Sequence, residues 1–133
     1  MEIIMKKGDF FQSPPGSALV IPVNTVGVAG AGLAQQAAHK FPGWQAAYRA
    51  ACERGDLTQA GDMVVHYGRG EHVFISFATK RHWRDRSDLA GIRRGAETLA
   101  RLVNYPPNLL RWNHVLAVPA LGCGLGGLDW KDV

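Results

Sequence analysis

The chain has 133 residues, of which 47% are apolar and 20% charged, and its formal net charge is +4 at pH 7. That length suits one domain, and that balance is typical of a globular protein rather than a disordered or membrane-embedded one. No apolar run approaches the roughly 18 residues that a membrane helix needs, and the first residues lack the pattern of a secretory signal. We therefore expect a cytoplasmic protein with no membrane association. The basic excess is compatible with a nucleic-acid or phosphate partner but does not establish one.

The two cysteines, Cys52 and Cys123, stand far apart, and neither they nor the histidines have the spacing of metal ligands. We expect reduced thiols, and neither a bound metal nor a cofactor. Cys123 lies between two glycines with no evident histidine partner, which indicates a small packing residue rather than a nucleophile.

Strand and helix patterns alternate along the chain. Apolar runs and alternating patterns predict strands over residues 3–7, 18–23, 63–67, 73–77 and 114–121. Apolar residues at helical spacing predict two helices, separated at Phe41-Pro42-Gly43. A third helix is expected with Ser87 as its N-cap and with a buried stripe made of Leu89, Ile92, Ala96, Leu99 and Val103. This alternation predicts an α/β sheet whose ligands lie beyond the carboxyl ends of its strands.

The last residues have the pattern of a helix start. Asp129 has the character of an N-cap, and residues 130–133 make a single turn, which is not stable on its own. We therefore expect the natural chain, or at least the natural domain, to continue past Val133.

Two glycine-rich stretches follow apolar strands, at residues 24–33 and 122–127. Glycine lets a backbone approach a ligand closely, and the N–H groups at a helix N-terminus bind anions. Neither stretch matches the GxGxxG of dinucleotide-binding folds or the GxxxxGK[ST] of a P-loop. Each stretch alone predicts a tight turn, whereas the two together indicate a pair of loops that hold a pyrophosphate.

Four motifs occur in the order in which macro domains carry them: Gly8-Asp9, Val23-Asn24, Gly30-Ala31-Gly32-Leu33-Ala34, and residues 119–124. The chain resembles this family over essentially its whole length. Residues 79–84 (TKRHWR) and 121–130 resemble more specifically macro domains of the DarG type, antitoxins that reverse the ADP-ribosylation of DNA by a DarT-type toxin. The resemblance implies a three-layer α/β/α macro domain over residues 1–133 with a central mixed sheet. It also implies a DNA-repair hydrolase that releases ADP-ribose from ADP-ribosylated single-stranded DNA.

The resemblance implies ADP-ribose as the bound group and the product. The Asp9 carboxylate would accept a hydrogen bond from the adenine amino group, the Phe10 N–H would contact the ring, and Asn24 would bind the distal ribose. The phosphates would be held by backbone N–H groups of Gly30, Ala31, Gly32, Leu33, Gly122, Cys123, Gly124, Leu125 and Gly126. The alternatives are an Asx turn at Asp9 and a buried turn amide at Asn24.

Lys80 is the catalyst that the resemblance implies. A lysine acts as a base or nucleophile only where desolvation or another cation favours its neutral form. Arg81 and His82 are its neighbours, although successive residues of an extended segment face opposite ways. Lys80 would either protonate the leaving base or attack the anomeric carbon. The alternative is an ordinary solvated lysine.

His82 and Trp83 would contact the modified base, because bases stack on aromatic rings; the alternative is that Trp83 packs on the sheet. Ala29 and Ala31 stand where DarG relatives often carry methionine and lysine. Gly126 stands where related hydrolases that act on modified proteins carry an aspartate, which favours DNA. Two other functions stay open: a hydrolase of ADP-ribosyl esters on proteins, and a module that binds ADP-ribose without turnover.

Overall fold

The computed structural model of the chain describes residues 10–12, 16–67, 72–104 and 116–119. Within these residues, four strands form one sheet in the order β2-β3-β1-β4. The strands are β1 (Ala18–Val23), β2 (Met63–Tyr67), β3 (Val73–Ala78) and β4 (Leu116–Ala117). Strand β1 is parallel to β3 and β4, while β2 is antiparallel to β3, which confirms the predicted mixed sheet. A short 3-10 helix, Phe10–Gln12, precedes the sheet.

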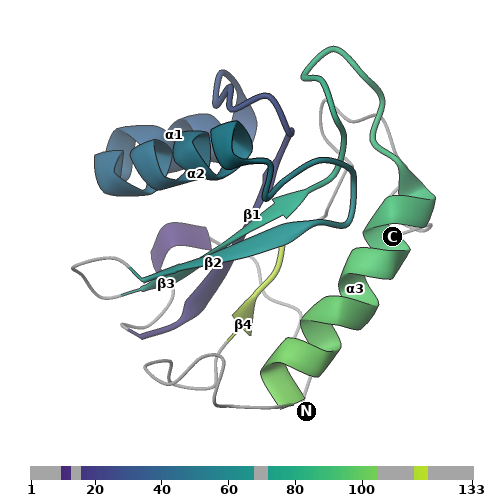
Figure 1. The fold of residues 1–133 in the computed structure, drawn as a ribbon. Coiled ribbons are helices and arrows are strands. Elements are labelled where there is room, and N and C mark those ends of the chain that lie inside the picture. The colour runs from purple at the N-terminus through teal and green to yellow at the C-terminus, as the bar shows by residue number, and fades with distance from the viewer. Residues whose placement is uncertain (1–9, 13–15, 68–71, 105–115, 120–133) are drawn as a thin grey trace.

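Helices cover both faces of this sheet (Figure 1). Helices α1 (Gly32–Lys40) and α2 (Pro42–Arg54) lie on one face, and α3 (Leu89–Asn104) lies on the other. The predicted three-layer arrangement is therefore confirmed. The predicted break between the first two helices is also confirmed, at Phe41. Pro42 begins α2, where its missing N–H leaves no hydrogen bond unmade.

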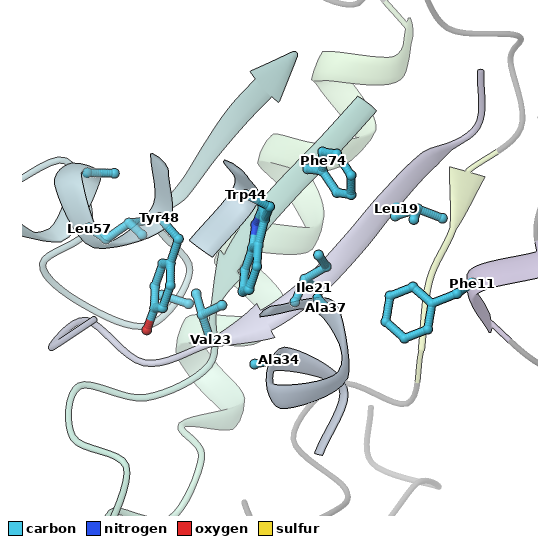
Figure 2. Close-up of a cluster of buried hydrophobic side chains, with 12 residues drawn as sticks. Phe11, Leu19, Ile21, Val23, Ala34, Ala37, Trp44, Tyr48, Leu57 and Phe74 are labelled. Carbon is cyan, nitrogen blue, oxygen red and sulfur yellow. The ribbon is translucent and has the colours of Figure 1, made fainter. Parts of the chain in front are cut away.

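Strand β1 is buried on both faces, because its side chains alternate between two apolar cores. The core beneath α1 and α2 includes Phe11, Leu19, Ile21, Val23, Trp44, Tyr48 and Phe74 (Figure 2). The core beneath α3 includes Ala18, Val20, Ile75, Phe77, Ile92 and Leu99. A continuous apolar strand is what this position requires, and it fixes the loop at the end of β1 on a rigid support.

The start of α3 differs from the prediction. Asp88, not Ser87, caps the helix: the Gly91 N–H donates to Asp88 Oδ1 at 3.1 Å, and the Ile92 N–H donates to Asp88 O at 2.9 Å. Ser87 is buried, and its hydroxyl has no hydrogen-bond partner among the described residues. The prediction was wrong because serine and aspartate are both favoured caps, and local sequence does not choose between adjacent ones.

The buried stripe of α3 also differs from the prediction. Ala96 is exposed, while Gly91 and Gly95 are buried. A Cβ atom on Gly91 would collide with Ala60, and one on Gly95 would collide with Phe77. The helix packs closely enough that only glycine fits at these two positions. A pattern that counts large apolar residues does not detect such a contact.

The predicted strands over residues 18–23 and 63–67 are confirmed, and β3 runs one residue further than expected, to Ala78. The expected last strand is present as β4, but it ends at Ala117, so the prediction that residues 118–119 belong to it was wrong. Other predicted features lie outside the described residues. They are strand 3–7, the turn at 68–70, residues 114–115 and 120–121, the helix start at Asp129 and the side chain of Val103. In the part of the chain that the structure describes, no helix is both long and apolar enough to span a bilayer.

Candidate functional site

Two loops begin side by side at one edge of the sheet. Strands β1 and β3 are parallel and paired along their whole lengths, from Ala18 with Val73 to Val23 with Ala78. The first loop, residues 24–31, connects β1 to α1, and the Lys80 loop, residues 79–88, connects β3 to α3 (Figure 1). In open α/β sheets this edge is where ligands bind.

The first loop is folded around the side chain of Asn24, which is 5% exposed. Asn24 Oδ1 accepts hydrogen bonds from the N–H groups of Val26, Gly27 and Val28 at 3.1, 3.1 and 3.3 Å. Its Nδ2 donates to Val28 O at 2.8 Å. Gly27 has a φ of +85°, a backbone conformation that favours glycine. Asn24 is therefore a buried turn amide, and its contact with a ribose stays a prediction.

Helix α2 supports the same amide through Tyr48. The Tyr48 hydroxyl lies 2.7 Å from Asn24 Oδ1 and 2.8 Å from Asn24 O. Burial raises the pKa of this hydroxyl, so it stays protonated and acts as the donor. Burial also raises the pKa of the nearby Cys52, a free thiol whose Sγ lies 4.0 Å from Asn24 O. Cys52 therefore packs as a protonated thiol.

The start of α1 presents backbone N–H groups. Its N-cap is Ala31, whose side chain makes no capping hydrogen bond, and the first N–H groups of any helix lack an intrahelical acceptor. Gly30, Ala31 and Gly32 are exposed, and Leu33 is half-buried. Gly32 has a φ of +59°, again in the region that favours glycine. These four of the nine residues predicted to hold phosphate thus form one largely exposed helix start without a side-chain cap, which suits an anion.

The two ends of the Lys80 loop are attached to the sheet and to α3. The Thr79 N–H donates to Val23 O at 2.9 Å, and the Asp88 N–H donates to Thr79 O at 2.9 Å. Both backbone groups of the residue before Lys80 are therefore fixed.

Thr25 attaches the first loop to the Lys80 loop. Its N–H and its hydroxyl both donate to Arg81 O, at 2.9 and 3.0 Å. Lys80 is consequently held between two anchored residues, beside the first loop. It is half-buried, and its ammonium group makes no hydrogen bond or ion pair with the residues that the structure describes.

Side chains order the tip of the Lys80 loop. The His82 N–H donates to Asp85 Oδ2 at 3.1 Å, the Asp85 N–H donates to His82 O at 3.0 Å, and the Arg84 N–H donates to His82 Nδ1 at 3.1 Å. Trp83 is 47% exposed. The centroid of its ring lies 5.1 Å from that of His82 and 4.6 Å from the guanidinium carbon of Arg84. Trp83 thus lies about half exposed at the tip, and its contact with a modified base stays a prediction.

Some predicted site residues lie outside the described part of the chain, namely Asp9, Gly122, Cys123, Gly124, Leu125 and Gly126. Phe10 lies in the 3-10 helix, half-buried, with its ring 5.2 Å from that of Phe11. The adenine contacts and the second phosphate loop thus stay predictions. The described residues contain no group of three or more side chains that suits a metal ion.

Three residues of the site were missed in the sequence. Thr25 and Tyr48 meet their partners only through tertiary contacts, so no local pattern marks them. Arg84 lies inside the TKRHWR motif, directly after Trp83. An arginine beside an aromatic residue was a signal that could have found it.

Most of the chain is similar to known proteins, although no protein-family model matches it. It is 44% identical over 118 residues to the DNA ADP-ribosyl glycohydrolase of Mycobacterium tuberculosis, a match that covers 87% of this chain and 32% of that protein. The chain spans about a third of the length of the curated relatives that it matches.

Solved structures match the fold as well. The macrodomain of Mycobacterium tuberculosis DarG superposes with a TM-score of 0.78 at 39% identity, covering 96% of this chain and 81% of that one. Thermosipho africanus DarTG in complex with ADP-ribose superposes with a TM-score of 0.79 at 36% identity, covering 93% of this chain and 34% of that one.

Proposed function

Because the chain belongs to the DarG type of macro domain, we propose that it hydrolyses the bond between ADP-ribose and a DNA base. The observation that carries this proposal is the position of Lys80. This lysine is anchored between Thr79 and Arg81 and joined through Thr25 to the loop that ends in an uncapped helix start. An uncapped helix start and the backbone of Lys80 thus lie at one edge of the sheet, which supports an anion site beside an ammonium group. Similarity to proteins named DNA ADP-ribosyl glycohydrolase supports the reaction.

In this proposal the pyrophosphate of ADP-ribose binds the N–H groups at the start of α1, from Gly30 to Leu33. The dipole of α1 adds to these hydrogen bonds. Residues 122–126 complete the phosphate site, and Asp9 and Phe10 hold the adenine. An amide nitrogen carries two N–H groups, so Asn24 keeps one for a ribose hydroxyl after bonding Val28 O. The similarity to an ADP-ribose complex from Thermosipho africanus supports this placement.

Hydrolysis breaks the bond between the anomeric carbon and a base nitrogen. Positive charge develops on the sugar, and the departing nitrogen takes a proton. Lys80 either donates that proton while water attacks the carbon, or it attacks the carbon as the neutral amine. In the second route the proton that the lysine nitrogen then loses goes to the departing base, and water hydrolyses the adduct. Both routes yield ADP-ribose and the unmodified base. Neither route needs a metal or a cofactor.

The modified base would lie against His82 and Trp83. Enzymes that act on a base need it outside a duplex, and aromatic stacking contributes about 1–3 kcal/mol per base. The exposed ring of Trp83 is accessible to an unpaired base. We therefore propose single-stranded ADP-ribosylated DNA as the substrate.

We further propose that the protein acts in the cytoplasm as the antitoxin of a DarT-type toxin and so repairs the DNA that the toxin modifies. The similarity to Thermosipho africanus DarTG supports such a pairing. A matching test is coexpression with the toxin, in which growth is expected to depend on Lys80.

The decisive experiment incubates the protein and its Lys80→Ala variant with two ADP-ribosylated single-stranded oligonucleotides, one linked through thymine and one through guanine. Gel shift follows the release of ADP-ribose. We expect release by the wild type and a loss of about 10²- to 10⁴-fold in the variant, the usual share of an acid or base catalyst.

Calorimetric binding of ADP-ribose is the control for folding, and Lys80→Ala is expected to retain it. If the wild type releases nothing from either oligonucleotide while still binding ADP-ribose, the proposal is wrong. ADP-ribosyl esters on proteins would then be the next substrate to test. If the protein does not hydrolyse these esters either, it would be a module that binds ADP-ribose without turnover.

A further inference from the structure

Hydrogen bonds within the tip of the Lys80 loop hold its shape. Asp85 uses one carboxylate oxygen to accept the His82 N–H, and His82 Nδ1 accepts the Arg84 N–H. Within this tip, Trp83 and Arg84 lie side by side.

Arg84 is an exposed cation at this tip whose charge has no ion-pair partner among the described residues. The nearest acid in sequence, Asp85, faces the backbone of His82 instead. Arg84 thus carries a full positive charge that the described part of the protein does not neutralise.

The guanidinium lies 4.6 Å over the Trp83 ring. A planar guanidinium that stacks on a ring keeps its N–H groups at its edge, where they remain free to bind two oxygens of a phosphate. Stacking also restricts the flexible arginine side chain. Trp83 and Arg84 therefore offer, in adjacent residues, an apolar ring and a positioned hydrogen-bond donor for a phosphate.

We propose that Arg84, positioned by Trp83, binds a backbone phosphate of the single-stranded DNA next to the modified nucleotide. This inference rests on the proposed function, and it names the part of the substrate that the tip recognises. The phosphate belongs to the DNA strand rather than to ADP-ribose, because the Arg84 guanidinium lies over the ring proposed to contact the base. The start of α1 already supplies the donors for the pyrophosphate.

The test measures kcat/KM on three substrates that carry the same modified base: a nucleoside without phosphodiesters, a trinucleotide and a ten-nucleotide strand. In Arg84→Ala we expect a loss of about tenfold on the two longer substrates, the value of one charge-assisted hydrogen bond. On the nucleoside we expect a change of less than about twofold. The slope of log kcat/KM against log salt is expected to shrink by about 0.7, the contribution of one phosphate on single-stranded DNA.

Arg101→Ala is the matched control, since Arg101 is an exposed arginine in the last turn of α3. It removes the same charge and is expected to leave both the length dependence and the salt slope unchanged. Arg84→Lys keeps the charge without the planar group and is expected to recover only part of the loss.

Two results would overturn the inference. An equal loss on nucleoside and strand, or weaker binding of ADP-ribose itself, would place Arg84 on the ADP-ribose phosphates. Unchanged activity on the strand would remove any role in DNA binding. If the wild type cleaves none of the substrates, the proposed function fails instead. Fluorescence anisotropy with an unmodified single strand then decides the Arg84 proposal alone, through the loss or retention of affinity in Arg84→Ala.

Discussion

The two loops at the functional edge are ordered by different means. The first loop is folded from within, around the buried amide of Asn24 and the hydroxyl of Tyr48. The Lys80 loop is fixed at its ends by backbone bonds, while its tip is ordered by the half-buried His82 and the exposed Asp85. Buried hydrogen bonds are costly to leave unmade, whereas exposed ones are replaced by water. The loop proposed to hold ADP-ribose is therefore expected to be rigid, and the tip proposed to hold DNA more adjustable.

Asn24→Ala is expected to have the largest effect on stability and tests the difference between the two loops most directly. It removes the acceptor of three backbone N–H groups and of the Tyr48 hydroxyl, so the free energy of unfolding should fall by about 3 kcal/mol. Asp85→Ala, which removes the equivalent carboxylate from the exposed tip, should cost less than about 1 kcal/mol. Urea denaturation measures both. Similar losses for the two variants would contradict the distinction between the loops.

The next largest effect is expected at the packing of α3, which follows the Lys80 loop. Gly95→Ala forces a methyl group into Phe77, on the strand that precedes the loop, so we expect overpacking to cost about 2 kcal/mol of unfolding free energy. Gly43→Ala is the control, because nothing lies within 4 Å of the added methyl group. This variant should stabilise the protein by up to about 1 kcal/mol through helix propensity. A stabilising Gly95→Ala would show that α3 is not packed on glycine.

Thr25→Val tests the contact that joins the two loops. It removes the hydroxyl bond to Arg81 O and keeps the N–H bond, so kcat should fall about fivefold, near 1 kcal/mol. The affinity for ADP-ribose should not change, because the start of α1 is untouched. Thr25→Ser should restore kcat. Equal losses in valine and serine variants would mean that Thr25 does not position Lys80 through its hydroxyl.

The smallest effect is expected between α2 and the sheet, where His66 Nε2 lies 3.1 Å from Ser76 Oγ and Trp44 Nε1 donates to the same oxygen at 3.1 Å. Trp44 in turn stacks on Tyr48. Burial, and to a lesser degree the charge of Arg54, lowers the pKa of His66. The unfolded chain therefore binds this proton more readily. Stability is complete above the unfolded pKa of about 6.5 and is lost as pH falls through it.

His66→Gln should accordingly flatten the decline of the unfolding free energy between about pH 7.5 and pH 5.5. Urea denaturation at several pH values measures this slope. Identical slopes in wild type and variant would exclude His66 as the titrating group.

How much the sequence predicted depends on how local each feature is. Strand β1 and the break at Phe41 depend on local apolar pattern and on proline, so both were predicted correctly. The glycine contacts of α3 depend on what lies opposite the helix, and a helical pattern carries no such information. The bond between Thr25 and Arg81 joins residues 56 apart in sequence. The motif around Lys80 gave the site through family resemblance, whereas the contacts that hold Lys80 required the fold.

The alanine cap of α1 has a kinetic consequence. In the proposed function, this helix start, which no side chain completes, would bind the pyrophosphate equally well in substrate, transition state and product. Such uniform affinity lowers KM without lowering the barrier to reaction. Free ADP-ribose would then compete with substrate for the enzyme, and turnover would slow as it accumulates. The rate advantage has to come from contacts that strengthen only as the bond breaks, around Lys80. Natural selection acting on speed would thus alter the Lys80 loop, and selection acting on product inhibition would alter the start of α1.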